Sequence, residues 1–213
     1  MATNKEVIRY IALGDSYTIG TGVALAQAWP VLLTQQLVAA GINIHLVANL
    51  ARDGWATQEI IDNRLPYLKK LEPDFATVLI GMNDWVWDVD PMTFVKNFSM
   101  IVEVLREVLP GPGQILVLTV PDVSVTPAGK KLIGQKDGKW DVAFYNTIIA
   151  DQCRFRDIHV IDFYKLFREL GDDPFLWAPD GLNPSAAMHR KIAEQIFPIA
   201  KKILTTEFKG TSP

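Results

Sequence analysis

A serine at position 16 stands where a catalytic nucleophile is expected. It follows Gly14 and Asp15, which come directly after an apolar run from Val7 to Leu13 that predicts a buried strand. A residue at the end of a strand is held by a rigid element and is still accessible, and nearby backbone N–H groups are free to bind a negatively charged oxygen. This combination favours nucleophilic acyl transfer.

Three more short motifs follow other apolar runs and carry polar groups suited to the same chemistry. Gly54 offers a backbone donor, Asn83 a side-chain amide donor, and Asp180 a carboxylate that can orient a base. Ligands of an open parallel sheet bind at the carboxyl ends of its strands. We therefore expect these three residues and Ser16 to lie on one rim of one sheet.

Strands must position these motifs, and five apolar runs in the sequence predict five strands. Several runs are continuously apolar, which is typical of parallel strands covered on both faces. Because helical patterns separate the runs, we expect an α/β fold with three layers, α/β/α, around a mostly parallel sheet. We expect one domain over residues 1–213, with a frayed tail at about 209–213. The runs are Val7–Leu13, Asn43–Ala48, Phe75–Ile80, Gln114–Val120 and Ile158–Ile161.

Capping and breaking residues mark the predicted helices. Thr57 can cap one helix that Pro66 should kink or break, and Asp90 can cap another that begins at Pro91. The segment Val123–Lys139 is rich in Gly, Lys and Pro, and we expect a long surface loop there. Further helices are expected over Gln27–Ala40, Trp140–Arg154 and Ser185–Leu204.

The composition narrows the classes of partner. The chain has 213 residues and a net charge of −3, which gives no reason to expect nucleic acid or an anionic membrane as partner. Its single cysteine, Cys153, allows neither an intrachain disulfide nor a cysteine-based metal site. No apolar run approaches the length of a membrane span, and no signal-peptide pattern precedes the first strand. We expect a cytoplasmic protein, although a secreted mature form would look the same.

These four motifs together resemble those of the SGNH, or GDSL, family of serine esterases and lipases, in its small thioesterase/arylesterase-like branch. The resemblance extends from Gly14 to the final helix. It implies that Ser16 is the nucleophile and that Asp180 orients the base. It also implies an oxyanion hole formed by the Ser16 N–H, the Gly54 N–H and the Asn83 side chain. We expect a flavodoxin-like sheet of strand order 2-1-3-4-5.

The base that the family pattern requires is absent. The family's last motif is Asp-x-x-His, and here Asn183 takes the place of the histidine after Asp180. An asparagine amide cannot take up and return a proton near neutral pH, although it can hydrogen-bond to Ser16 or Asp180. The chain has three other candidates for a base: His45, His159 and His189. Structural roles are the better interpretation for all three, and only His189 is considered as a surrogate base.

Three explanations for Asn183 stay open. It is a replacement in an otherwise ordinary esterase, a natural departure with low residual activity, or the mark of a noncatalytic relative that binds an acyl or glycosyl ligand. We favour the first, and so predict an acyl-serine esterase impaired in proton transfer, because the rest of the motif set is intact. Loss of a triad base costs on the order of a millionfold in turnover.

The substrate is predicted only as a class. Trp55, Trp85 and Leu182 stand next to motif residues and are candidates for the wall of a substrate pocket. A small short-chain or aryl ester is the expected substrate, with sugar-ester deacetylation and thioester hydrolysis as alternatives. We expect no cofactor and no metal. The oligomeric state is left open.

A phosphate- or nucleotide-binding α/β module is the rival class. The stretch from Gly14 to Gly22 is dotted with glycines and lies between a strand and a helix. It lacks both the Gly-Lys-Ser/Thr ending and the Gly-x-Gly-x-x-Gly pattern of phosphate-binding loops, so this reading is poorly supported.

Overall fold

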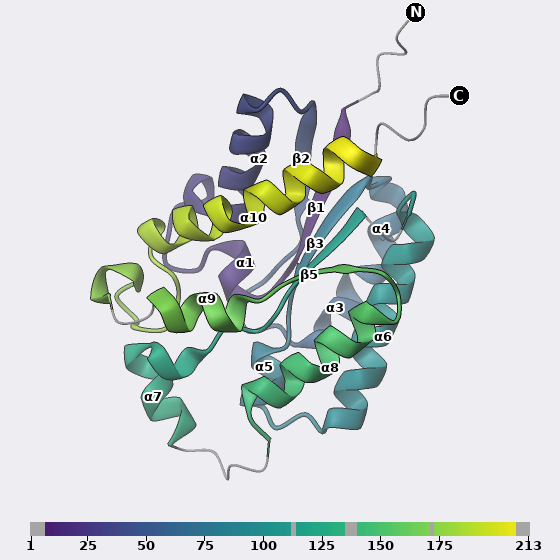
Figure 1. The fold of residues 1–213 in the computed structure, drawn as a ribbon. Coiled ribbons are helices and arrows are strands. Elements are labelled where there is room, and N and C mark those ends of the chain that lie inside the picture. Colours follow the sequence, from purple (N-terminus) through teal and green to yellow (C-terminus); the bar gives the residue numbers. More distant parts are fainter. Residues whose placement is uncertain (1–6, 112–113, 135–139, 171–172, 208–213) are drawn as a thin grey trace, which may run out of the picture.

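The computed structural model describes residues 7–111, 114–134, 140–170 and 173–207. The predicted frayed tail at 209–213, and residues 135–139 of the predicted surface loop, lie outside these ranges. Figure 1 shows a central sheet with helices packed on both of its faces.

The sheet has five strands, all parallel, in the order β2-β1-β3-β4-β5. This confirms the predicted strand order, and the observed ends differ from the predicted ones by at most two residues. β1 and β3 lie inside the sheet and are buried along almost their whole length, as their continuous apolar sequences predict. The strands are β1 (Ile8–Gly14), β2 (Ile44–Asn49), β3 (Phe75–Leu79), β4 (Ile115–Leu118) and β5 (His159–Ile161).

Two apolar clusters, one on each face of the sheet, form the core and confirm the three-layer arrangement. Side chains alternate between the faces along β1, so Ile11 and Leu13 join one cluster and Tyr10 and Ala12 the other. The first cluster packs under α3 (Thr57–Asn63), α4 (Leu65–Leu71), α5 (Met82–Val86), α6 (Pro91–Val108) and α8 (Val142–Arg154). The second packs under α1 (Ser16–Ile19), α2 (Trp29–Ala39), α9 (Phe163–Leu170) and α10 (Ala186–Glu207).

Local signals explain several helix boundaries. The Asp90 carboxylate accepts hydrogen bonds from the Met92 and Thr93 N–H groups, so the predicted cap of α6 is confirmed. α3 ends before Arg64, and α4 has Pro66 as its second residue, which confirms the predicted break. The prediction that Thr57 caps α3 is wrong.

Thr57 is instead the first residue of α3, and its hydroxyl is used elsewhere. The N–H of Ala56, which precedes the helix, donates to the Glu59 carboxylate at 3.0 Å. This bond satisfies a backbone N–H at the start of the helix that would otherwise be unpaired.

The prediction of a surface loop over Val123–Lys139 is wrong for the residues that the structure describes there, 123–134. Residues Val123–Val125 form a 3₁₀ turn, and α7 (Pro127–Ile133) follows it. The Thr126 hydroxyl caps α7 by accepting the Gly129 N–H at 2.8 Å, with Pro127 at the first position of the helix. A Thr-Pro pair therefore starts a helix where the local composition favoured a loop.

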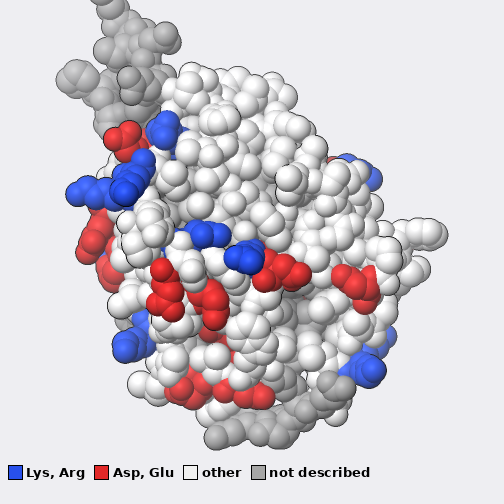
Figure 2. Space-filling view, turned by 180° about the vertical axis from the view of Figure 1, so that it is seen from behind, with Lys and Arg blue, Asp and Glu red and all other residues white. Residues whose placement is uncertain are grey.

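The surface carries mixed charge. On the face shown in Figure 2, basic side chains lie among acidic ones, and large uncharged areas separate them. Among the described residues, no helix is both long enough and apolar enough to cross a bilayer.

Candidate active site

Three neighbouring strands bring three of the motifs together. β1 lies between β2 and β3, and Gly14 at its end is in register with Leu79 at the end of β3. Beyond the end of β2, the Arg52 N–H donates to the Gly14 carbonyl at 3.3 Å. The segments that carry Ser16, Gly54 and Asn83 therefore leave the sheet side by side, at the carboxyl edge.

Ser16 is the first residue of α1 and is half-buried. Asp15 precedes it as the helix cap, and its carboxylate accepts the Tyr17 N–H at 3.0 Å. Gly14 allows this sharp strand-to-helix turn, because a Cβ there would lie 2.3 Å from the Thr18 hydroxyl oxygen. Asp15 therefore has a structural role as the cap of α1.

The second and third motifs are bonded to each other. The Asn83 amide donates to the Trp55 carbonyl at 2.8 Å, which leaves its second N–H for another acceptor. Gly54, directly before Trp55, has a φ of +74°, a conformation that glycine adopts without strain. The buried Asp84 carboxylate accepts both the Thr57 N–H, at 3.0 Å, and the Thr57 hydroxyl, at 2.5 Å. Asp84 thus ties the start of α3 to α5, which follows β3.

Asp15 and Asp84 both have pKa values above the ordinary value of an aspartate. Burial raises the pKa of Asp15 to about 7, and the negative charges of Asp84 and Asp53 act in the same direction. Burial also raises the pKa of Asp84, against the hydrogen bonds from Thr57. Both carboxyl groups therefore act as structural hydrogen-bond acceptors beneath the rim.

The fourth motif closes over the start of α1. Trp177 and Pro184 form an antiparallel bridge at the base of the loop between them. The Tyr17 hydroxyl donates to the Leu182 carbonyl at 2.7 Å. Because Tyr17 follows Ser16 and Leu182 precedes Asn183, this bond brings the two motifs into proximity. No local sequence signal marks Tyr17 for this contact, although it stands inside the first motif.

Asn183 and Asp180 form a hydrogen-bonded pair. The Asn183 amide donates to one Asp180 oxygen at 2.7 Å, and the Leu182 and Asn183 N–H groups donate to the other, each at 2.8 Å. Burial acts to raise the pKa of Asp180, but these hydrogen bonds hold it below its ordinary value. The Asn183 side-chain oxygen is buried and has no partner among the described residues. An acceptor is therefore unused at the position where the family pattern has its base.

The three histidines lie on β2, β5 and α10, outside the four motifs. His189 is fully buried on α10, and its Nδ1 accepts the backbone N–H of Trp29 at 3.3 Å. Burial lowers the pKa of His189 to about 4, so the ring is neutral at ordinary pH. His45 lies exposed in β2 and His159 exposed at the start of β5, the two edge strands. The expectation that His189 is a packed helix histidine is confirmed.

The three candidate pocket residues lie under the rim. Trp55 is 8% exposed and Trp85 is 4% exposed, and both belong to the apolar cluster under α3 and α6. The Arg64 guanidinium lies 4.3 Å from the centre of the Trp55 ring, and its Nε donates to the Leu50 carbonyl at 2.8 Å. Leu182 is half-buried against the same cluster. A role for these side chains in binding substrate stays a prediction.

A parallel β2-β1-β3-β4-β5 sheet with a serine directly beyond β1 and an asparagine beyond β3 defines the class of SGNH-type hydrolase folds. The chain belongs to the GDSL-like lipase/acylhydrolase family, whose family model matches residues 12–191. In the described parts of the chain, no group of three or more His, Cys, Asp or Glu side chains is arranged to hold a metal ion.

Two esterases with similar sequences support the family assignment. A multidomain esterase from Ruminococcus flavefaciens is 26% identical over 131 residues, which are 60% of this chain and 16% of that protein. An arylesterase from Vibrio mimicus is 23% identical over 110 residues, which are 50% of this chain and 52% of that protein. The matched segment thus spans about a sixth and about half of these relatives.

The fold is shared with solved structures. The crystal structure of TesA superposes with a TM-score of 0.74 at 17% sequence identity, covering 92% of this chain and 99% of that one. Such a likeness at low identity extends to the fold and not to the substrate.

Proposed function

We propose that this chain is a carboxylic ester hydrolase whose reaction passes through an acyl-Ser16 intermediate, and that Asn183 impairs its proton transfer. The observation that carries the proposal is the convergence of Ser16, Gly54 and Asn83 at three adjacent strand ends. These residues supply a nucleophile and donors for an oxyanion, which is the minimum set for acyl transfer.

The reaction follows from these roles. The Ser16 Oγ attacks the ester carbonyl carbon, and the carbonyl electron pair moves to oxygen, where the Ser16 and Gly54 N–H groups and the Asn83 amide stabilise it. Collapse of this intermediate breaks the bond to the leaving alkoxide, which takes up a proton. Water then attacks the acyl-serine and releases the acid and the free hydroxyl. Each stage needs a group that accepts a proton and returns it.

Asn183 cannot be that group. Its amide reproduces the bond that a histidine would make to Asp180, and its free oxygen can hold the Ser16 hydroxyl by accepting its hydrogen bond. Neither contact removes the proton at neutral pH. We therefore expect a formed but slow active site, in which binding and the oxyanion donors supply the remaining catalysis.

Short-chain and aryl esters are the substrates that we propose to test first. The resemblance to an arylesterase supports them, and so do the apolar side chains Trp55 and Leu182 beside the motif residues. Acetylated sugars are a second class of substrate to test.

A noncatalytic ligand-binding role is the second candidate. The specific observation in its favour is the buried Asn183 oxygen, which has no partner among the described residues and would gain one from a ligand hydroxyl or N–H that reaches it. A ligand that protects the protein against thermal unfolding without being hydrolysed would favour this candidate.

Hydrolysis of p-nitrophenyl acetate and butyrate tests the first proposal. We expect the parent chain to lie near the Ser16→Ala blank and Asn183→His to exceed it by orders of magnitude. Asn63→His, at the exposed end of α3, is the matched control for hydrolysis by an added imidazole. A fast parent that Ser16→Ala abolishes would show that another group serves as base. Activity no higher in Asn183→His than in Asn63→His would overturn the esterase proposal for these substrates.

A further inference from the structure

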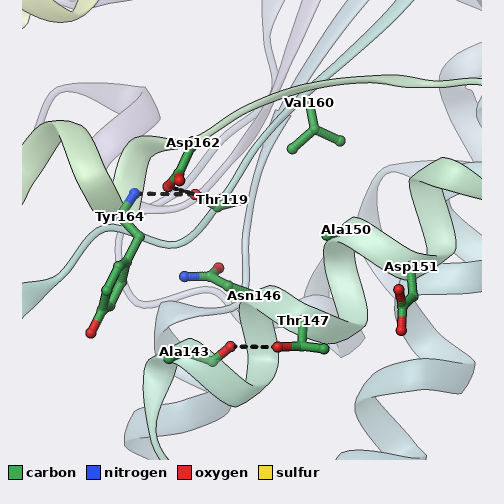
Figure 3. Close-up of a pocket in the computed structure, with 9 residues that line it drawn as sticks. All are labelled: Thr119, Ala143, Asn146, Thr147, Ala150, Asp151, Val160, Asp162 and Tyr164. Carbon is green, nitrogen blue, oxygen red and sulfur yellow. Dashed lines mark hydrogen bonds between the residues drawn. The ribbon is translucent and has the colours of Figure 1, made fainter.

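A groove separate from the Ser16 site lies between α8 and the carboxyl ends of β4 and β5 (Figure 3). Its volume is about 380 Å³. Thr119 follows β4 and Asp162 follows β5, whereas Thr147 and Asp151 come from α8. Since β5 is three strands away from β1 in the sheet, the groove begins roughly 14 Å to the side of the strand that ends at Ser16.

The hydrogen-bond donors in the wall of the groove are already used within the protein. The Asn146 side chain donates to the Val120 carbonyl at 2.8 Å and accepts the Val120 N–H at 2.7 Å. The Thr147 hydroxyl donates to the Ala143 carbonyl at 3.1 Å. These bonds fix the wall and leave few N–H or O–H groups for a ligand to accept from.

Acceptors remain unused. Through one carboxylate oxygen, Asp162 accepts the Lys165 N–H at 2.9 Å and the Thr119 hydroxyl at 3.5 Å. Asp151 binds Arg154 through one oxygen, at 2.8 Å. Within the described ranges, the second oxygen of each carboxylate has no hydrogen-bond partner. The Thr147 oxygen donates its proton and so keeps its lone pairs.

The floor of the groove is apolar, because Ala143, Ala150 and Val160 contribute methyl groups, and the Tyr164 side chain borders it. Unused acceptors above an apolar floor suit a ligand with several O–H donors and apolar C–H faces. The two carboxylates oppose an anionic ligand. We propose that this groove is a second binding site, for a neutral oligosaccharide, which acts independently of the chemistry at Ser16.

Isothermal titration of the full chain with xylotetraose tests the proposal. The titration uses Ser16→Ala protein, so that hydrolysis plays no part and a failed esterase proposal does not affect the result. We expect saturable binding that Ala150→Leu, which adds volume to the floor, weakens by about tenfold or more. Ala39→Leu, at an exposed position on α2, is the matched control and should bind like the parent.

A second variant and two further probes complete the experiment. Thr147→Val keeps the shape of the side chain and removes one acceptor, so it should also weaken binding while thermal unfolding stays near that of the parent. Tetragalacturonate, an anionic chain of the same length, should bind more weakly than xylotetraose. Absence of xylotetraose binding, binding unaffected by both groove variants, or tighter binding of tetramethylammonium would overturn the proposal.

Discussion

Replacing Asp15 with asparagine should change how the stability of this protein depends on pH. Asp15 is 2% exposed, and burial raises its pKa from an ordinary value of 3.8 to about 7. The Asp15→Asn variant cannot ionise, yet its side-chain oxygen can still accept the Tyr17 N–H that starts α1. The substitution therefore removes the titrating carboxyl group but keeps the hydrogen bond that caps α1.

The sign and size of the effect follow from this pKa. Between about pH 4 and pH 7, Asp15 is ionised in the unfolded chain but still protonated in the folded protein. The free energy of unfolding therefore falls as pH rises through this window and is constant, for this group, on either side. A difference of about 3 pKa units between the folded and unfolded states corresponds to about 4 kcal/mol in the free energy of unfolding. His189 titrates in the same window with the opposite sign, so only the difference between variant and parent isolates Asp15.

Urea unfolding of both proteins at intervals from pH 4 to pH 8 measures this difference. We expect the stability of Asp15→Asn relative to the parent to increase by about 4 kcal/mol from pH 4 to pH 7 and then to level off. Asp62→Asn, at an exposed position on α3 where the side-chain oxygen can still accept from Gln58, is a control for the substitution itself. A relative stability that does not change with pH would refute the buried-acid reasoning.

Three further predictions concern the packing around the site. Burial lowers the pKa of His189 to about 4, so the stability of the parent relative to His189→Gln should fall by about 3 kcal/mol as pH falls from 6.5 to 4, as measured by urea unfolding of both proteins. Gly14→Ala should destabilise by about 1–3 kcal/mol in the same assay, because its Cβ would lie 2.3 Å from a side-chain oxygen and 2.6 Å from a carbonyl. Gly111→Ala, where a Cβ meets nothing within 4 Å, should be close to neutral. Tyr17→Phe should lose about 1 kcal/mol, since the hydroxyl donates to a carbonyl of the last motif, whereas the 57% exposed Tyr67→Phe should not.

Much of the architecture could be predicted, because the signals that specify it are local. Continuous apolar runs identified all five strands, and alternation with helices indicated a parallel sheet. Asp90 before Pro91 marked the start of α6. Composition misled over Val123–Val125 and Pro127–Ile133, where glycine and lysine masked the Thr126 cap of α7. Thr57 was misassigned because its partner, Asp84, is 27 residues away in the sequence.

The sequence by itself determined the fold class, the family and the chemical identity of the groups at the strand ends, including an asparagine where the family has its base. Periodicity and short motifs are sufficient for these, because each depends on neighbours along the chain. Only the tertiary structure decided that Asn183 bonds to Asp180 with its oxygen unpartnered, and that His189 is paired with Trp29 inside the core. These outcomes depend on which side chains meet across the fold and on how deeply each is buried, and neither quantity is encoded in local spacing.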